Sequence, residues 1–375
     1  MSKINLQIGK LRRAKGMTQQ ELGEKLGVSF QTVSKWETNV TMPDITVLPE
    51  LAALFGVSVD ALLGLVNLEE YQPALNGRPE FWGERVEYLK RSRSYMWNED
   101  YLRHLVENVW KIHRPVRILD CGCAYGAVGM MLLPFLPKGS TYTGVDHSEK
   151  LLEEGRLLYA DQGMEATFVQ SDSLDFCPEK MCSGGLFDLV ISQAVLRHSD
   201  CAQKLVEKMA AFVKPGGLLV AIDCNREFEE SGVYLDGEDY ADLSCHEGMR
   251  KLWKTEWEKQ GRDFAAAMKA PHYMRRAGLK NVEVRMNDRV NYLAPDQESY
   301  TENLADFRSI KGWNVRPDYR QQEEIANVFL NRGMERADVD DYFRRQEQCM
   351  RYFEDNPETA ALCHVWGFMI SFGWK

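Results

Sequence analysis

The sequence predicts an α/β protein in which a small all-α domain precedes a larger domain built on a doubly wound parallel sheet. Two observations predict this arrangement. Helix signals alone fill residues 1–66, whereas apolar strand segments alternate with helical segments from about residue 80 onward, as in sheets with right-handed crossovers. The length of 375 residues suits two or three domains at about 150 residues each.

Composition narrows the class of protein. No apolar run approaches the ~18 residues that a membrane span needs, and the first residues lack the apolar centre of a secretory signal. Nine cysteines at irregular spacing predict reduced thiols in a cytoplasmic protein. Neither close pair, Cys121/Cys123 or Cys177/Cys182, belongs to a repeated zinc-ligand set, so we expect no metal site.

Charge is distributed unevenly along the chain. The net charge of −10 argues against nucleic-acid binding over the whole surface. Residues 1–66, however, carry seven Lys/Arg against six Asp/Glu. The two parts of the chain are therefore expected to face different partners.

The N-terminal residues predict two short helices joined by a tight turn. Thr18 and Glu21 have the spacing of a capping box, in which each side chain satisfies a free backbone N–H at a helix start. Gly27 suits the left-handed residue that ends that helix, and Ser29 can cap the next one. A further helix is expected to open at Pro43.

The stretch MTQQELGEKLGVSFQTVSKWE resembles the phage-repressor (Xre-like) helix-turn-helix family, and the resemblance covers about residues 4–64. It implies that the second helix enters the major groove of double-stranded DNA. It also implies a homodimer on a two-fold site. The positions that match the family's DNA contacts are Gln19, Ser29, Phe30, Gln31, Thr32 and Lys35. The weak positive charge leaves open a module used for protein contacts instead.

Residues 67–79, with two prolines and a glycine, predict a linker to a second domain at residues 80–375. We expect the first strand of that domain to end at Asp120, followed by Gly122, Ala124 and Gly126 at every second position. This spacing and the acid do not suit a diphosphate, but an acid suits a positively charged group such as an α-ammonium. Alanine is small enough for this loop, and we expect no positive φ at Ala124.

Acidic residues also follow the next two predicted strands. Asp146 ends the second strand, where a carboxylate can accept the two hydroxyls of a ribose. Asp172 and Ser173 follow the third, where they can meet an adenine amino group. Ligands of such sheets bind at the carboxyl ends of the strands, so an adenosine ligand is expected there.

Together with FDLVISQAVLRH (187–198) and KPGGLLVAID (214–223), these features resemble the class I S-adenosylmethionine-dependent methyltransferases. The resemblance implies a Rossmann-like seven-stranded sheet and S-adenosyl-L-methionine as cofactor. It places Gln193 beside the cofactor and, through an N-terminal lid, Tyr95 and Trp97 as well. The alternative for Trp97 is packing within a core helix.

His198, after the fourth strand, is the candidate general base because its ordinary pKa lies near neutrality. The alternative is a histidine that only hydrogen-bonds the next loop. Asn225 and Arg226 are expected to orient an acceptor. Residues 281–293 and 361–373 resemble the family's last two strands, and insertions at 226–271 and 295–357 are expected to form a helical cap over a small acceptor, or a dimer interface.

These features predict a methyltransferase that acts on a small molecule and is fused to a DNA-binding transcriptional regulator. The alternative is a repressor that senses S-adenosylmethionine without turnover. Methylation of a macromolecule is a third hypothesis. Ser192–Val195 stands where an Asp/Asn-Pro-Pro-aromatic signature is expected for methylation of nucleic-acid bases.

Overall fold

The computed structural model describes residues 4–55, 57, 59–65, 79–177, 185–244 and 247–375. The predicted linker, except for Pro79, lies outside the described residues. No helix among the described residues is long and apolar enough to cross a bilayer. The chain divides into two compact units, Met1–Pro73 with His246–Thr255 and Val315–Gln348, and Ala74–Cys245 with Glu256–Asn314 and Cys349–Lys375.

The first unit begins with five helices, α1 (Ile8–Ala14), α2 (Gln19–Leu26), α3 (Phe30–Glu37), α4 (Leu48–Phe55) and α5 (Val59–Leu62). The predicted capping box is confirmed at Thr18 and Glu21. Gly27 ends α2 with φ +65°. The helix expected to open at Pro43 begins instead at Leu48, because the Asp44 carboxylate accepts hydrogen bonds from the N–H and hydroxyl of Thr46 and holds a local turn.

Two parts of the expected cap group with this unit. Helix α18 (Tyr319–Asn331) and the first part of α19 (Arg336–Asp355) belong to it, as does the start of α15 (Glu247–Gln260). The Phe329 and Tyr342 rings pack with centroids 4.8 Å apart. Lys251 of α15 pairs with Asp338 of α19 at 2.9 Å.

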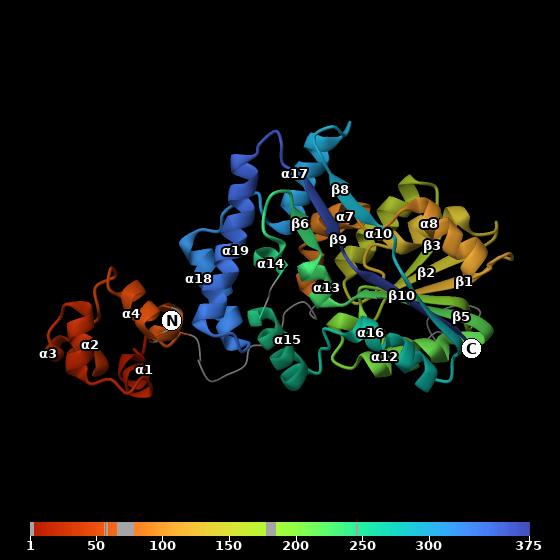
Figure 1. The fold of residues 1–375 in the computed structure, drawn as a ribbon. Coiled ribbons are helices and arrows are strands. Elements are labelled where there is room, and N and C mark those ends of the chain that lie inside the picture. The colour runs from red at the N-terminus through yellow and green to blue at the C-terminus, as the bar shows by residue number, and fades with distance from the viewer. Residues whose placement is uncertain (1–3, 56, 58, 66–78, 178–184, 245–246) are drawn as a thin grey trace. The chain divides into compact units, whose positions relative to one another are not determined.

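The second unit is built on a seven-stranded sheet of order β3-β2-β1-β4-β5-β10-β7 (Figure 1). Strands β1 to β5 pair in parallel, and β10 runs antiparallel to both β5 and β7. The predicted Rossmann-like seven-stranded sheet is confirmed. The strands are β1 (Arg117–Cys121), β2 (Thr141–Asp146), β3 (Ala166–Gln170), β4 (Phe187–Gln193), β5 (Val213–Cys224), β7 (Lys280–Met286) and β10 (Phe368–Trp374).

Neighbouring residues of each central strand face opposite sides of the sheet and build two cores. Ile118 joins one buried cluster and Leu119 the other, as the two-residue period of a strand requires. Helices α12 (Ala202–Phe212) and α16 (Ala266–Arg276) supply the second cluster. The order of strands reverses between β1 and β4, which is where ligands of such sheets bind.

The last two predicted strands are each broken in two. The first of them forms β7 and then β8 (Val290–Leu293), and the second forms β9 (Leu362–Val365) and then β10. Strands β8 and β9 join β6 (Val233–Leu235) in a separate sheet of order β6-β9-β8. Asn287 breaks the first strand because its side chain accepts the N–H of Arg289 and donates to the carbonyl of Met96. Gly367, with φ +68°, breaks the second.

Close packing at Gly129 gives a test of this fold. Gly129 lies in α9 (Ala127–Leu132), and a Cβ there would lie 2.2 Å from the Tyr159 hydroxyl and 2.4 Å from the Tyr142 ring. Helix propensity favours alanine over glycine by about 1 kcal/mol, whereas overpacking costs about 1–3 kcal/mol. Because three atoms would lie within 2.5 Å of the added Cβ, we expect the upper end of that cost and predict that Gly129→Ala lowers the free energy of unfolding in urea by about 2 kcal/mol.

The matched control is Gly163→Ala, at φ +65° with open space around the Cβ. It should cost only the left-handed backbone penalty of about 1–2 kcal/mol, with no clash added to it. A Gly129→Ala variant as stable as the natural chain contradicts the packing of α9 on β2.

Candidate functional site

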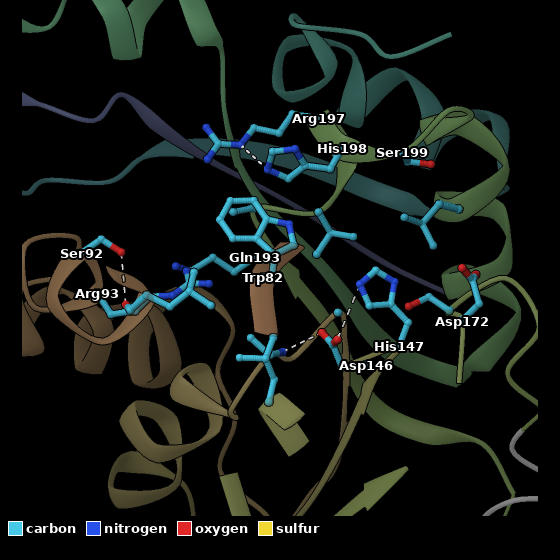
Figure 2. A pocket seen from close by; sticks show the side chains of 18 of the residues that line it. Trp82, Ser92, Arg93, Asp146, His147, Asp172, Gln193, Arg197, His198 and Ser199 are labelled. Carbon is cyan, nitrogen blue, oxygen red and sulfur yellow. Dashed lines mark hydrogen bonds and ion pairs between the residues drawn. The ribbon is translucent and has the colours of Figure 1, made fainter. Parts of the chain in front are cut away.

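A cavity of about 320 Å³ lies at the carboxyl edge of the sheet (Figure 2). Loops after four strands line it, and so do Trp82 and one face of α7 (Val86–Ser94). The predicted site residues that the structure brings together here are Gly122, Ala124, Asp146, Asp172, Ser173, Gln193 and His198. Asp120, Gly126, Tyr95 and Trp97 do not line the cavity.

The loop after β1 approaches the cavity through its backbone. Gly122 has φ +74°, and a Cβ there would lie 2.6 Å from Val195. Gly126, with φ +84°, packs against the Tyr159 and Phe168 rings. Ala124 has φ +52°, so the expectation that this position needs no positive φ is wrong. A left-handed alanine costs about 1–2 kcal/mol.

Asp146 holds this loop in place. One of its carboxylate oxygens accepts the N–H of Ala124 and the other accepts the N–H of Ser148, both at 2.9 Å. The Ala124 bond stabilises the left-handed backbone there. Because each carboxylate oxygen can accept more than one hydrogen bond, Asp146 can also accept from a ligand in the cavity that it lines.

Asp120 lies behind the loop, fully buried. The Tyr142 hydroxyl donates to its Oδ2 at 2.7 Å, while its Oδ1 has no hydrogen-bond partner. Burial raises the pKa of Asp120 to about 7, although Tyr142 and Arg93 oppose the shift. A buried carboxyl with one free oxygen suits a positively charged ligand group nearby.

Arg93 is a site residue that the sequence reasoning missed. It projects from α7 into the cavity wall (Figure 2), its Nε has no hydrogen-bond partner, and NH1 donates only weakly to Met96 Sδ at 3.6 Å. Burial lowers its pKa, which Tyr125 and Asp120 partly oppose. A buried guanidinium with a free donor is suited to bind an anion. The available signal was the shared helix face of Leu89 and Arg93, four residues apart.

Tyr95 and Trp97 pack in the interior instead of covering the cavity. The Tyr95 hydroxyl donates to the carbonyl of Asn303 at 3.1 Å. The Trp97 indole donates to Oε1 of Gln193 at 3.1 Å and so positions that amide in the cavity wall. Trp97 is buried in the core, as the alternative expected, but it lies in the connection between α7 and α8 (Glu99–His104) and not within a helix. Helix α7 and the turn after it contribute other side chains to the cavity, namely Tyr88, Leu89, Arg93 and Met96.

His198 is surrounded by arginines. Its Nδ1 lies 3.0 Å from Arg262 NH2 and its Nε2 lies 3.2 Å from Arg197 Nε. Burial and the positive charges of Arg197, Arg226 and Arg262 hold the pKa of His198 well below its ordinary value. Both ring nitrogens face guanidinium donors, so these contacts favour a hydrogen-bonding role over that of a general base.

Arg197 is held by carboxylates beside the cavity. It pairs with Glu229 of α13 (Arg226–Ser231) at 2.8 Å and lies 3.8 Å from Asp223. Burial opposes ionisation of Glu229, but Arg197, Arg226 and Lys311 outweigh it and lower its pKa. Glu229 and Trp366 complete the cavity wall.

The residues expected to orient an acceptor are used in structural contacts. Asn225 caps α13 by accepting the N–H of Glu227, and Arg226 pairs with Glu256 at 3.3 Å. Of the described residues in the two insertions, Glu229 lines the cavity and none from the 295–357 segment does. Enclosure of the acceptor by a helical cap stays a prediction.

On the predicted DNA-reading helix, Phe30, Gln31 and Lys35 are exposed. Ser29 accepts the N–H of Thr32 at 3.2 Å and caps α3. Gln19 donates to Glu37 at 2.9 Å, so its side chain is held within the module.

Two family models match the chain. Residues 8–62 match a helix-turn-helix model, and residues 112–263 match a methyltransferase-domain model. The chain combines a helix-turn-helix domain with a methyltransferase domain. Both predicted resemblances are thereby confirmed.

The methyltransferase domain is similar to curated ubiquinone biosynthesis O-methyltransferases. That of Chelativorans sp. (strain BNC1) is 27% identical over 125 residues, which are 33% of this chain and 47% of the relative. That of Vibrio parahaemolyticus is 30% identical over 113 residues, which are 30% of this chain and 46% of the relative. The chain spans about half the length of these relatives.

Similar solved structures include phosphoethanolamine N-methyltransferase 2 of Haemonchus contortus in complex with S-adenosyl-L-methionine, with a TM-score of 0.39 and 14% identity over 74% of this chain and 53% of that one. The [4+2]-cyclase SpnF gives a TM-score of 0.44 and 14% identity over 82% of this chain and 99% of that one.

The raised pKa of Asp120 predicts a pH dependence of stability in the ligand-free methyltransferase domain. Between about pH 4 and pH 7 the folded chain keeps a proton that the unfolded chain releases, so stability falls as pH rises across this window. We predict that Asp120→Asn reduces the stability lost between about pH 5 and pH 8 by about 1 kcal/mol or more, measured by urea unfolding.

The control for this pH series is Asp175→Asn, which changes an exposed carboxylate. An unchanged pH dependence in Asp120→Asn contradicts a protonated, buried Asp120.

Proposed function

We propose that this chain is a class I S-adenosyl-L-methionine-dependent methyltransferase for a small-molecule acceptor, joined to a DNA-binding transcriptional regulator that acts in the cytoplasm. The observation that carries the enzyme proposal is the order of polar groups across the cavity. In Figure 2, Arg93 and Asp172 lie on opposite sides, with Asp146 between them. The cofactor has the same order of parts: amino acid, ribose and adenine.

The residues present fit each part of the cofactor. The guanidinium of Arg93, which lines the cavity, would bind the carboxylate, and the free Oδ1 of Asp120 favours the α-ammonium from behind the loop. Asp146 would accept the ribose hydroxyls, and Asp172 and Ser173 would lie at the adenine. When bound, the cofactor supplies an electrophilic methyl group on a sulfonium.

The acceptor would lie against Trp82, Tyr88 and Trp366, near the Arg197–Glu229 pair. Aromatic walls exclude water and suit the positively charged sulfonium. Orientation of the acceptor would supply much of the acceleration. Phenols belong in the first acceptor panel because the curated relatives are named as O-methyltransferases.

A repressor that senses the cofactor without turnover is the second candidate. One observation favours it: His198 and Glu229, two titratable groups beside the proposed acceptor position, are both engaged by arginines. Turnover by this site would then require an acceptor that reacts without a strong protein base, such as a thiolate or a neutral amine.

The decisive experiment measures formation of S-adenosylhomocysteine from S-adenosylmethionine with phenols, amines and thiols. We predict that at least one class gives product above the rate without acceptor. Asp146→Ala, which removes the proposed ribose contact, should bind S-adenosylhomocysteine at least about tenfold more weakly. Tight cofactor binding with no turnover on any class contradicts the enzyme and favours the sensor.

We further propose that the N-terminal domain binds double-stranded DNA as a homodimer through the exposed face of α3. Lys35 would contact phosphate or a base edge from this face. We predict that Lys35→Ala weakens binding to DNA from the chain's own upstream region in gel-shift titrations and lowers the slope of log affinity against log salt by about 1 per domain copy.

The control variant is Lys25→Ala, which removes an equal charge from α2. Equal effects of Lys35→Ala and Lys25→Ala contradict contact through α3 and favour general electrostatic attraction.

A further inference from the structure

Strand β7 forms one end of the seven-stranded sheet, and all its residues except Val282 are exposed. Among the residues that the structure describes, β10 is its only neighbour in the sheet. Val284 is 37% exposed and Met286 is 49% exposed. An exposed edge strand with apolar side chains is a template for pairing with another chain.

The hydrogen bonds of β7 show which backbone groups face outward. Asn287 donates its N–H to the carbonyl of Phe368, and Arg285 and Glu283 lie opposite β10 residues in the same register. Because bonded and non-bonded pairs alternate in an antiparallel ladder, the odd-numbered residues bond to β10. The N–H and C=O groups of Val284 and Met286 therefore point away from the sheet, and the ladder shifts register beyond Glu283.

A side-chain contact agrees with this assignment. The Tyr101 hydroxyl donates to the carbonyl of Met286 at 2.9 Å, as expected for a carbonyl that faces away from β10. A carbonyl oxygen can accept a second hydrogen bond. This contact is therefore compatible with a further strand beyond β7.

We propose that β7 pairs with β7 of a second copy of this chain, antiparallel and with the two-fold axis at Val284, so that the two sheets become one. In this register Val284 faces Val284 of the other copy, and their outward N–H and C=O groups form a bonded pair. Val282 faces Met286 of the other copy. The backbone excludes an axis that falls between two residues, because outward groups would then face inward ones. An axis at Glu283 or Arg285 also satisfies the backbone, with a non-bonded pair at its centre.

Side-chain chemistry selects the axis at Val284 among these. With the axis at Val284, Glu283 of each copy lies directly opposite Arg285 of the other, and both pairs lie on one face of the joined sheet. The valines and methionines of both copies lie on the other face, where side-chain pairs stabilise a sheet. An axis at Glu283 would instead oppose two like charges. Within one copy, Glu283 and Arg285 already lie 3.1 Å apart and are about half exposed.

The register can be tested by cysteine cross-linking of the full chain. Residues opposite each other in a bonded pair have Cα atoms about 5.5 Å apart, within the range of a disulfide. Val284→Cys should form a cross-linked dimer under mild oxidation. Met286→Cys is more exposed, but its copies would lie about 14 Å apart along the strands and should not cross-link.

The unsubstituted chain, oxidised in the same way, shows how much cross-linked dimer its own cysteines form. Equal cross-linking of Val284→Cys and Met286→Cys, or none in Val284→Cys, overturns the proposed pairing.

Charge reversal provides an independent test by sedimentation of the full chain over a range of concentrations. The dimer contains two copies of the Glu283–Arg285 pair. Glu283→Arg or Arg285→Glu alone turns both pairs into like charges and should raise the dissociation constant of the dimer at least about tenfold. The double reversal restores both pairs and should restore the dimer. Arg320→Glu, in an exposed helical pair with Glu324, is the matched control and should leave the dimer unchanged.

A monomer at every concentration, a dimer insensitive to the single reversals, or a double reversal that does not restore it overturns the proposal.

Discussion

A fully buried carboxyl and a half-buried guanidinium lie at the carboxyl edge of the sheet, and each keeps one polar atom that the protein does not satisfy. These are Oδ1 of Asp120 and Nε of Arg93. Leaving such groups unpaired in a protein interior is costly. The arrangement is most readily understood as the binding site of a ligand that carries both an ammonium and a carboxylate, and the proposed function depends on this.

Hydrogen bonds also fix the loops that line the cavity next to these two groups. Asp146 binds the backbone on both sides of the cavity edge, at Ala124 and Ser148. It thereby stabilises the left-handed backbone of Ala124. On the acceptor side, arginines and carboxylates neutralise each other around His198 and Glu229. The cavity therefore orients and desolvates its ligands and offers little free acid or base chemistry.

Local sequence signals predicted the parts of the fold that local physics decides. The capping box at Thr18 and the acids at the ends of β1 and β2 depend on residues close together in sequence. The second sheet was missed because Asn287 breaks its strand through a contact to Met96, far away in the chain. The surroundings of His198 were missed for the same reason, since Arg262 arrives from a distant helix connection. Arg93 was missed because its direction depends on how α7 packs on the sheet.

The account is tested most directly by comparing the affinities of S-adenosylhomocysteine and 5′-methylthioadenosine, which lacks the amino-acid end. In the natural chain S-adenosylhomocysteine should bind at least about 100-fold more tightly. Arg93→Met should reduce this ratio at least about tenfold without changing the affinity for 5′-methylthioadenosine, whereas Arg91→Met, on the exposed side of α7, should not. Equal affinities in the natural chain, or a ratio unchanged by Arg93→Met, would contradict the claim that the buried charges bind the amino-acid end of the cofactor.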